Sequence, residues 1–468
     1  MTRKHIDYGT ALAVVILSII ALLGGTRIAR LRAAAEEQTW FVAFAGAGEF
    51  SGLTGPKEKA DESLVEKRIE KGHHFLDHRA IPASWDSRFV GKTGTIRNQG
   101  DLSTCWAFAS LSGLEAYLLP TEKEDFSVDH MITYCGFGER AMSGGTFAMA
   151  LAYLTAWRGP VYEKEDPYND GNSNPAAKIR YHLQEARLLN DDAAAVKEAV
   201  LHYGAVQSSM YADEGLLFTD ASTSYFDAAK DCYYYNGTER TNHDVLIVGW
   251  DDNYSADNFA IRPPVDGAFL CQNSWGSEFG DGGYFYVSYA DTRIINFAMA
   301  YSRIDPLGVY DGIYQQDDLG WVAQMGFEEH SSWGANVFTA KRDELLKAAG
   351  FYAVLPQTDY EIYVELWPDT YSFSERELVA SGSLEYAGYY TIDFNHAVAL
   401  AEGDKFAIIL KLTTKEKGNQ LAAETEENGA RAIVGTGQSY ISADGNYWYD
   451  AASSLYCNLC LKGFTTGK

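Results

Sequence analysis

The pattern of apolar and polar residues predicts a helix that begins at Cys105. Ser103 and Thr104 can cap its start, and Pro120 ends it. Apolar residues recur along it at helical spacing, at Ala107, Leu111, Leu114 and Leu118. One face of this helix is therefore expected to lie against a core.

Strand-like runs follow this helix at residues 244–250, 268–273 and 283–289, where apolar and aromatic side chains dominate. A clear helix followed by such runs predicts an α+β domain, to which we assign residues 81–305.

The pattern changes beyond residue 305 to short alternating segments separated by turn residues. Between Tyr360 and Leu366 the alternation predicts Ile362, Val364 and Leu366 on one face, with Glu361, Tyr363 and Glu365 on the other. Residues 405–412 alternate in the same way. We therefore predict that residues 306–468 form an all-β sandwich of their own.

The first 35 residues have the pattern of an export signal. Arg3 and Lys4 precede an apolar run at residues 11–25, and small residues follow near Ala35. Cleavage after Ala35 is one outcome. An uncleaved membrane anchor over residues 8–25 is the alternative, because basic residues on both flanks leave the orientation undecided. Residues 36–80 are expected to be a linker or a short pro-region.

Composition narrows the classes of function. The 468-residue chain carries a net charge of −26, which argues against nucleic acid or anionic lipid as the main partner. Its 6 cysteines are too few for a disulfide framework. Cys457 and Cys460 lie in a strand-like segment and are expected to be buried thiols. No accompanying pair of ligands suggests a metal site, and no cofactor is expected.

The chemistry suggested by the residues centres on Cys105. A thiol at a helix start is exposed to the positive end of the helix dipole, which stabilises a thiolate nucleophile. Gln99, just upstream, is a candidate oxyanion donor. A nucleophile of this kind needs a base and a residue that orients the base, and His243 and Asn273 downstream provide both.

These segments resemble papain-like cysteine peptidases. The resemblance is carried by Arg97-Asn98-Gln99-Gly100, Cys105-Trp106-Ala107-Phe108, Ser143-Gly144-Gly145, Asn242-His243 and Asn273-Ser274-Trp275-Gly276. It implies a two-lobed domain, one lobe helical and the other resembling a β-barrel.

The resemblance also implies a role for each site residue. Cys105 would be the nucleophile, His243 the general acid and base, Asn273 the residue that orients the imidazole, and Gln99 the oxyanion donor. The indole of Trp275 would shield the histidine from water. Trp106 would likewise support the site, as the residue after the nucleophile.

The same family pattern places substrate-binding residues at Gly144, Gly145, Phe147, Ser209 and Asp244. Relatives usually carry a small residue after the catalytic histidine, where it lines the pocket for the second side chain upstream of the cut. Asp244 stands there in this chain. Its carboxylate, with Ser209 and Phe147, favours a basic side chain in that pocket; the alternative is a carboxylate turned toward solvent.

The resemblance also implies a difference from most relatives near the nucleophile. Leu102 and Met142 occupy positions where most relatives carry a disulfide, so an apolar contact between them is expected instead.

The C-terminal part is similar to the lectin-like module of papain-type peptidases from anaerobic bacteria, through residues 314–321, 336–340 and 360–364. Its Tyr and Trp side chains either stack on sugar or peptide, or pair across strands within the sheet.

The sequence thus predicts an exported, thiol-dependent endopeptidase that acts on polypeptides. It would be secreted or extracytoplasmic, and its β-sandwich would bind a glycan or another surface ligand. Two alternatives remain open at this point. One is a catalytically inactive surface adhesin, and the other is a transpeptidase that passes the same acyl group to an amine.

Overall fold

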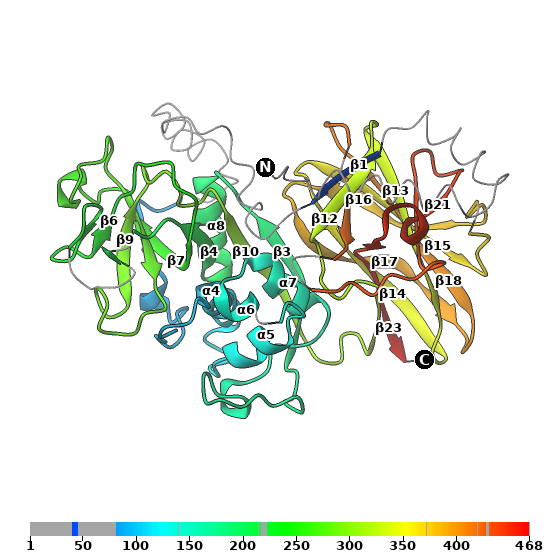
Figure 1. Ribbon diagram of the computed structural model, residues 1–468, viewed down its shortest axis with the longest axis horizontal. Helices are drawn as coiled ribbons and strands as arrows, with labels where there is room; N and C mark the ends of the chain where they lie inside the picture. The colour runs from blue at the N-terminus through cyan, green and yellow to red at the C-terminus, as the bar shows by residue number, and fades with distance from the viewer. Residues whose placement is uncertain are drawn as a thin grey trace, which may run out of the picture.

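The computed structural model describes residues 40–44 and 81–467, except 139, 214, 217–221, 371, 419 and 427–429. The predicted leader lies outside this range, as does most of the predicted linker. Among the described residues, no helix is long and apolar enough to cross a membrane. Figure 1 shows two halves: the N-terminal half contains most of the helices, and the C-terminal half is built mainly from strands.

The helical lobe of the first half forms around α4 (Cys105–Leu118), which lies where the sequence predicts a helix. Every residue from Trp106 to Ala116 is buried, so the helix is enclosed on all sides and not on one face only. Thr104 precedes the helix but makes no side-chain capping bond. Its hydroxyl instead lies 2.8 Å from that of Tyr168. The surrounding helices are α5 (Val128–Tyr134), α6 (Arg140–Ser143) and α7 (Phe147–Thr155).

The second lobe is a sheet whose strands include the three predicted in this region. Its central strand, β7, pairs with β2, β4 and β8, and β8 pairs with β9. α8 (Ala193–Tyr203) packs on this lobe. The strands are β2 (Ser84–Asp86), β3 (Tyr181–Leu188), β4 (Val206–Met210), β5 (Phe226–Asp227), β6 (Cys232–Tyr233), β7 (His243–Asp251), β8 (Ala268–Gln272), β9 (Tyr284–Ser288) and β10 (Ala298–Pro306).

The C-terminal half contains two sheets that enclose an apolar core. One has the order β16-β15-β18-β13-β20-β21. In β18, Phe406, Ile408, Leu410 and Leu412 point into the core, whereas Ala407 and Ile409 join a smaller aromatic cluster on the other face. The strands of this sheet are β13 (Ser331–Thr339), β15 (Thr358–Leu366), β16 (Glu377–Leu384), β18 (Lys405–Thr413), β20 (Ser439–Ser442) and β21 (Tyr449–Asp450).

The opposing sheet extends by strand pairing into the N-terminal half. β17 pairs with β3, and the contact is close: a Cβ atom on Gly388 would lie 2.1 Å from the carbonyl oxygen of Ala186. The remaining elements are β1 (Trp40–Phe44), β11 (Gly312–Tyr314), β12 (Ala323–Phe327), β14 (Glu344–Ala353), β17 (Gly388–Leu400), β19 (Leu421–Glu424), α10 (Ala451–Leu455), β22 (Asn458–Leu459) and β23 (Leu461–Gly467). The backbone of β1 pairs with β12, as Figure 1 shows.

The structure tests several predicted details of the sandwich. In β15, Glu365 is buried and Leu366 is 41% exposed, because the alternation breaks at the end of the strand. Tyr314 and Trp321, in the segment that resembles a lectin-like module, are buried and therefore pack within the fold. The thiols of Cys457 and Cys460 are free and buried, as predicted.

A buried ionic cluster anchors the segment that joins the two halves. Lys462 binds Asp317 at 2.6 Å, and both side chains are at most 1% exposed. Glu424 accepts hydrogen bonds from the backbone N–H groups of Asp318 and Leu319. The carboxylate of Asp318 in turn binds Arg158, after α7, at 2.7 Å.

We expect Lys462→Met to destabilise the fold strongly, because it leaves the Asp317 carboxylate buried without its cation. Removing one partner of a buried pair typically costs about 3–5 kcal/mol. Urea unfolding followed by tryptophan fluorescence measures the loss. Arg262→Met, which breaks the exposed pair with Asp257, is the control and should cost at most about 1 kcal/mol. Equal losses in the two variants would contradict this account.

The cluster also predicts a pH dependence of stability. Burial, with a smaller contribution from Asp317, raises the pKa of Glu424 to about 7. A carboxyl whose pKa is higher in the folded state stabilises that state while protonated. This contribution is complete below its ordinary pKa near 4.5 and is lost as the pH rises through 7. The melting temperature should therefore fall more between pH 5 and pH 8 for the wild type than for Glu424→Gln, because the buried carboxyl loses its proton over about this range. Thermal unfolding at each pH measures this difference. Parallel curves would argue against it.

Candidate active site

Cys105 is the first residue of α4 and is half-buried, with a free thiol. Because the helix starts here, its N-terminal N–H groups and its dipole lie at the sulfur. The backbone N–H groups of Asp244, Trp106 and Cys105 itself all favour the thiolate. The helix is enclosed by protein, which gives the thiol a fixed position.

His243 and Asn273 come together as the sequence predicts. They lie at adjacent ends of the paired strands β7 and β8 and are 3% and 4% exposed. His243 Nε2 is 2.8 Å from Asn273 Oδ1. An amide oxygen can only accept, so Nε2 carries the proton and Nδ1 is the nitrogen left for exchange with a thiol.

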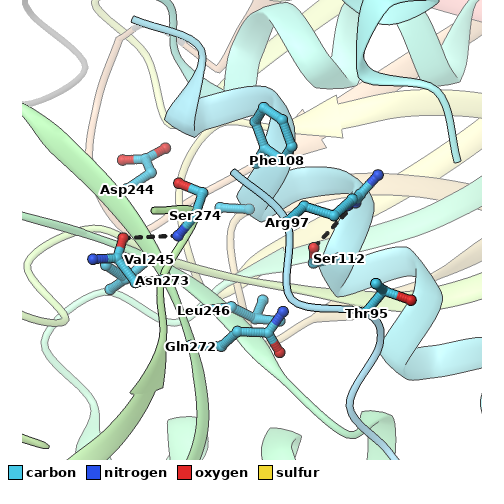
Figure 2. A pocket seen from close by; sticks show the side chains of 11 residues that line it. Thr95, Arg97, Phe108, Ser112, Asp244, Val245, Leu246, Gln272, Asn273 and Ser274 are labelled. Atoms are coloured by element: carbon cyan, nitrogen blue, oxygen red, sulfur yellow. Dashed lines mark hydrogen bonds between the residues drawn. The ribbon is translucent and has the colours of Figure 1, made fainter. Parts of the chain in front are cut away.

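The indole of Trp275 stacks on the imidazole, with ring centroids 4.5 Å apart and 28° between the planes. Asn273 is held in turn, since its Oδ1 also accepts from the Ser274 backbone N–H at 2.8 Å (Figure 2). Both ends of the His243–Asn273 hydrogen bond are therefore fixed by neighbours.

Gln99 lies beside this pair through its contacts with Ser274. Its backbone N–H donates to the Ser274 carbonyl at 2.8 Å, and its side-chain oxygen accepts from the Ser274 hydroxyl at 2.6 Å. One hydrogen of its amide donates to the Leu102 carbonyl. The second hydrogen is not used in this bond.

An ionic pair fastens the segment that carries Gln99 onto α4. Arg97 binds Glu115 at 3.1 Å and the Phe126 carbonyl at 2.7 Å. Burial raises the pKa of Glu115 to about 7, and Arg97 partly offsets this. Figure 2 shows Arg97 beside Ser112 in a small pocket between α4 and strands β7 and β8.

Burial dominates the electrostatics of the catalytic pair. It raises the pKa of the Cys105 thiol to about 12, with a further rise from Asp244, and lowers the pKa of His243 to about 4. A lone charge on either group is thus unfavourable. A thiolate and an imidazolium that form together by proton transfer stabilise each other, so the site favours charges created as a pair.

Contacts link three of the predicted substrate-binding residues: Asp244, Ser209 and, through Phe297, Phe147. The Ser209 hydroxyl donates to the Asp244 carboxylate at 2.6 Å, and the Ser209 backbone N–H donates to the Phe297 carbonyl at 3.1 Å. The ring of Phe297 stacks on Phe147 at 4.0 Å. The Asp244 carboxylate is therefore bonded to protein groups.

Gly145 lies against Trp106, whereas a Cβ atom on Gly144 would meet open space. A Cβ atom on Gly145 would come within 2.5 Å of the Trp106 indole, so only glycine fits. The indole N–H donates to the Ala141 carbonyl at 3.2 Å. This contact holds the start of α4 near the position where relatives have a disulfide. Met142 is 45% exposed, and its expected contact with Leu102 stays a prediction.

Sequence analysis missed three buried polar residues beneath the site: Ser110, Gln207 and Tyr301. Their hydroxyl and amide groups bond to one another and to Asp244. The only signal in the sequence is Gln207, the one long polar side chain in the buried strand Val206–Met210.

Each half of the chain matches a family of known proteins. Residues 81–302 match the model of the papain family of cysteine proteases, and residues 313–465 match that of a lectin-like domain. Cathepsin S of Bos taurus is 30% identical over 220 residues, which cover 44% of this chain and 60% of that protein. Cysteine proteinase 1 of Zea mays is 27% identical over 267 residues, or 52% of this chain and 68% of that protein.

A solved structure is similar over both halves. It comprises the cysteine protease and lectin-like domains of Cwp84, a surface layer associated protein of Clostridium difficile. The TM-score is 0.73 at 27% identity, covering 91% of this chain and 98% of that one. The C116A variant of Cwp84 after propeptide cleavage gives a TM-score of 0.72 at 29% identity, over 82% and 99% of the two chains. The chain therefore combines a papain-family cysteine protease domain with a lectin-like domain.

Proposed function

We propose that the protein is an extracytoplasmic, thiol-dependent endopeptidase in which Cys105 is the nucleophile. The observation that carries the proposal is the buried hydrogen bond between His243 Nε2 and Asn273, which leaves Nδ1 for a thiol at a helix start. An inactive binding protein has no need of this hydrogen bond together with Gln99.

Catalysis follows from these positions. The proton of Cys105 moves to His243 Nδ1, and the sulfur attacks the peptide carbonyl carbon. The carbonyl oxygen becomes an oxyanion, bound by the free amide hydrogen of Gln99 and the backbone N–H of Cys105. Loss of one such donor typically costs about 3–4 kcal/mol of transition-state stabilisation.

The imidazolium then protonates the leaving amine, and the C–N bond breaks to give a thioester. Neutral His243 takes a proton from water, the hydroxide attacks the thioester, and the carboxylic acid leaves as the thiol reforms. Asn273 holds the ring through both steps. It adds no charge, so it does not oppose the thiolate.

The Asp244 carboxylate supports a preference for basic side chains. Its hydrogen-bond donors among the described residues are neutral: the Ser209 hydroxyl at 2.6 Å and the Gln207 amide at 2.8 Å. Burial raises the pKa of Asp244, because no cation compensates the buried charge. A substrate lysine or arginine would supply that cation, while Phe147 and Phe297 pack on its alkyl chain.

The lectin-like domain is proposed to hold the peptidase at a surface. The support is that Cwp84, which shares both domains, is a surface layer associated protein. Aromatic side chains that are exposed in this half include Trp367 at 64% and Tyr447 at 74%. Stacking on a glycan uses such rings, since each offers an open face to a sugar. The predicted leader at residues 1–35 agrees with a location outside the cytoplasm.

Labelling with an epoxide or vinyl-sulfone inhibitor tests the nucleophile. We expect one covalent adduct on the wild type and none on Cys105→Ala, because the thiolate is the reacting group. Hydrolysis of a fluorogenic peptide should fall by about 10⁴-fold or more in the variant. Mass spectrometry locates the adduct. Activity that survives in Cys105→Ala, or an adduct at another residue, would refute the assignment.

Paired dipeptide substrates test the role of Asp244. We expect kcat/KM to be at least about tenfold higher with Arg than with Phe at the second position upstream of the cut, equivalent to about 1.4 kcal/mol. Asp244→Asn keeps the size of the side chain and removes its charge, so the preference for Arg should disappear. A wild-type enzyme that strongly prefers Phe would count against the acidic pocket.

A further inference from the structure

One buried side chain connects the neighbours of both catalytic residues. Gln207, in β4, is fully buried. Its amide nitrogen donates to the Asp244 carboxylate at 2.8 Å and to the Trp106 carbonyl at 3.4 Å. Asp244 directly follows His243, and Trp106 directly follows Cys105. The amide therefore spans from the start of the nucleophile helix to the strand that carries the histidine.

The amide oxygen of Gln207 is bonded as well. It accepts from the Tyr301 hydroxyl at 2.9 Å. The Ser110 hydroxyl lies 3.0 Å from this oxygen and 2.7 Å from a second acceptor, the Trp106 carbonyl. With both hydrogens donated and its oxygen bound by Tyr301, the primary amide is held in one orientation. Its partners belong to α4, β7 and β10, so a single side chain joins three elements beneath the site.

Packing leaves this network little room to shift. Ser110 and Tyr301 are at most 1% exposed. A Cβ atom on Gly113 of α4 would lie 2.8 Å from the Tyr301 ring, so there is no room for a side chain between the helix backbone and the tyrosine. A side chain at position 207 that cannot bond to α4 therefore changes the environment of the helix directly.

The position of the Gln207 amide matters because the amide donates to a buried carboxylate. The Asp244 carboxylate has two described donors, the Gln207 amide and the Ser209 hydroxyl. A buried carboxylate that loses a donor either moves to find another or takes up a proton, since uncompensated burial costs several kcal/mol. Either change alters the residue bonded directly to His243.

We propose that Gln207 is a positioning residue that sets the spacing and orientation of Cys105 and His243, acting through Trp106 and Asp244. The inference rests on the proposed peptidase function. A misplacement of about 1 Å between reacting groups can cost about 10²-fold in rate, so one lost bridge is measurable.

The test compares Gln207→Leu with Gln184→Leu. Gln184 is also a fully buried glutamine in a strand, but it bonds to Thr391 at the junction with β17, away from the site. We expect Gln207→Leu to lower kcat at least about tenfold, with KM changed less than threefold. Gln184→Leu should stay within about twofold of the wild type in both constants. Thermal unfolding measures the loss of stability in each.

The rate at which iodoacetamide alkylates Cys105 measures the reactivity of the thiol and does not depend on the binding of a peptide substrate. Its rate should fall about tenfold in Gln207→Leu and remain unchanged in Gln184→Leu. A wild-type thiol with no enhanced alkylation rate would overturn the proposed function itself. A wild-type thiol that reacts rapidly, with Gln207→Leu matching Gln184→Leu, would overturn only the role of Gln207.

A second variant covers the case in which Gln207→Leu does not fold. Gln207→Glu keeps the shape but places a carboxyl against Asp244, and repulsion between two adjacent carboxylates raises the pKa at which the pair takes up one proton. As the pH falls, one proton shared by the two carboxyls restores a donor to Asp244. The other titratable groups that face this site are Cys105, His243 and Tyr301, and they are common to both proteins. The alkylation rate of the variant relative to the wild type should therefore rise from pH 8 to pH 5, about where a carboxyl pair titrates; a constant ratio would overturn the inference.

Discussion

The enclosure of α4 between the two lobes is the constraint on which the active site depends. A helix start at a surface would leave its N–H groups to water, and its dipole would be screened. Here the helix is buried from Trp106 to Ala116, and Cys105 remains half-buried at its open end. The thiol is thus held by a rigid element, while the groups that act on it come from other strands and loops.

Burial of this kind has an electrostatic cost that the site offsets locally. Burial raises the pKa of Cys105 and lowers the pKa of His243, so an isolated thiolate and an isolated imidazolium are both disfavoured. Three backbone N–H groups near the sulfur and the fixed proton on His243 Nε2 shift the balance toward a charged pair. Asn273 supports that pair without adding a charge, whereas a carboxylate in its place would compete with the thiolate for the imidazolium.

The sequence was informative where a short-range pattern carries the structure. The spacing of Ala107, Leu111 and Leu114 predicted α4, and apolar runs predicted β7, β8 and β9. The site residues Cys105, His243 and Asn273 were found because each lies in a local motif. The hydroxyl of Thr104, expected to cap the helix, binds Tyr168 instead, since a tertiary partner was available.

The sequence was uninformative where the partners come from distant segments. Ser110, Gln207 and Tyr301 meet across three elements, and no periodicity links residues that are so far apart in the chain. The continuation of the sandwich into the peptidase half was missed for the same reason. Pairing of β17 with β3 depends on the approach of Gly388 to Ala186, which only the folded chain reveals.

The junction between the halves bears on how the peptidase meets its substrate. Two domains on a flexible linker sample many relative positions, and the binding of one then constrains the other weakly. Here a shared sheet, the Asp318–Arg158 pair and the stack of Trp157 on Phe464 hold the halves together. Under the proposed attachment to a surface, a ligand bound by the lectin-like domain would set the direction in which the Cys105 site faces. The junction would then determine the distance and angle at which peptide bonds on the same surface can be reached.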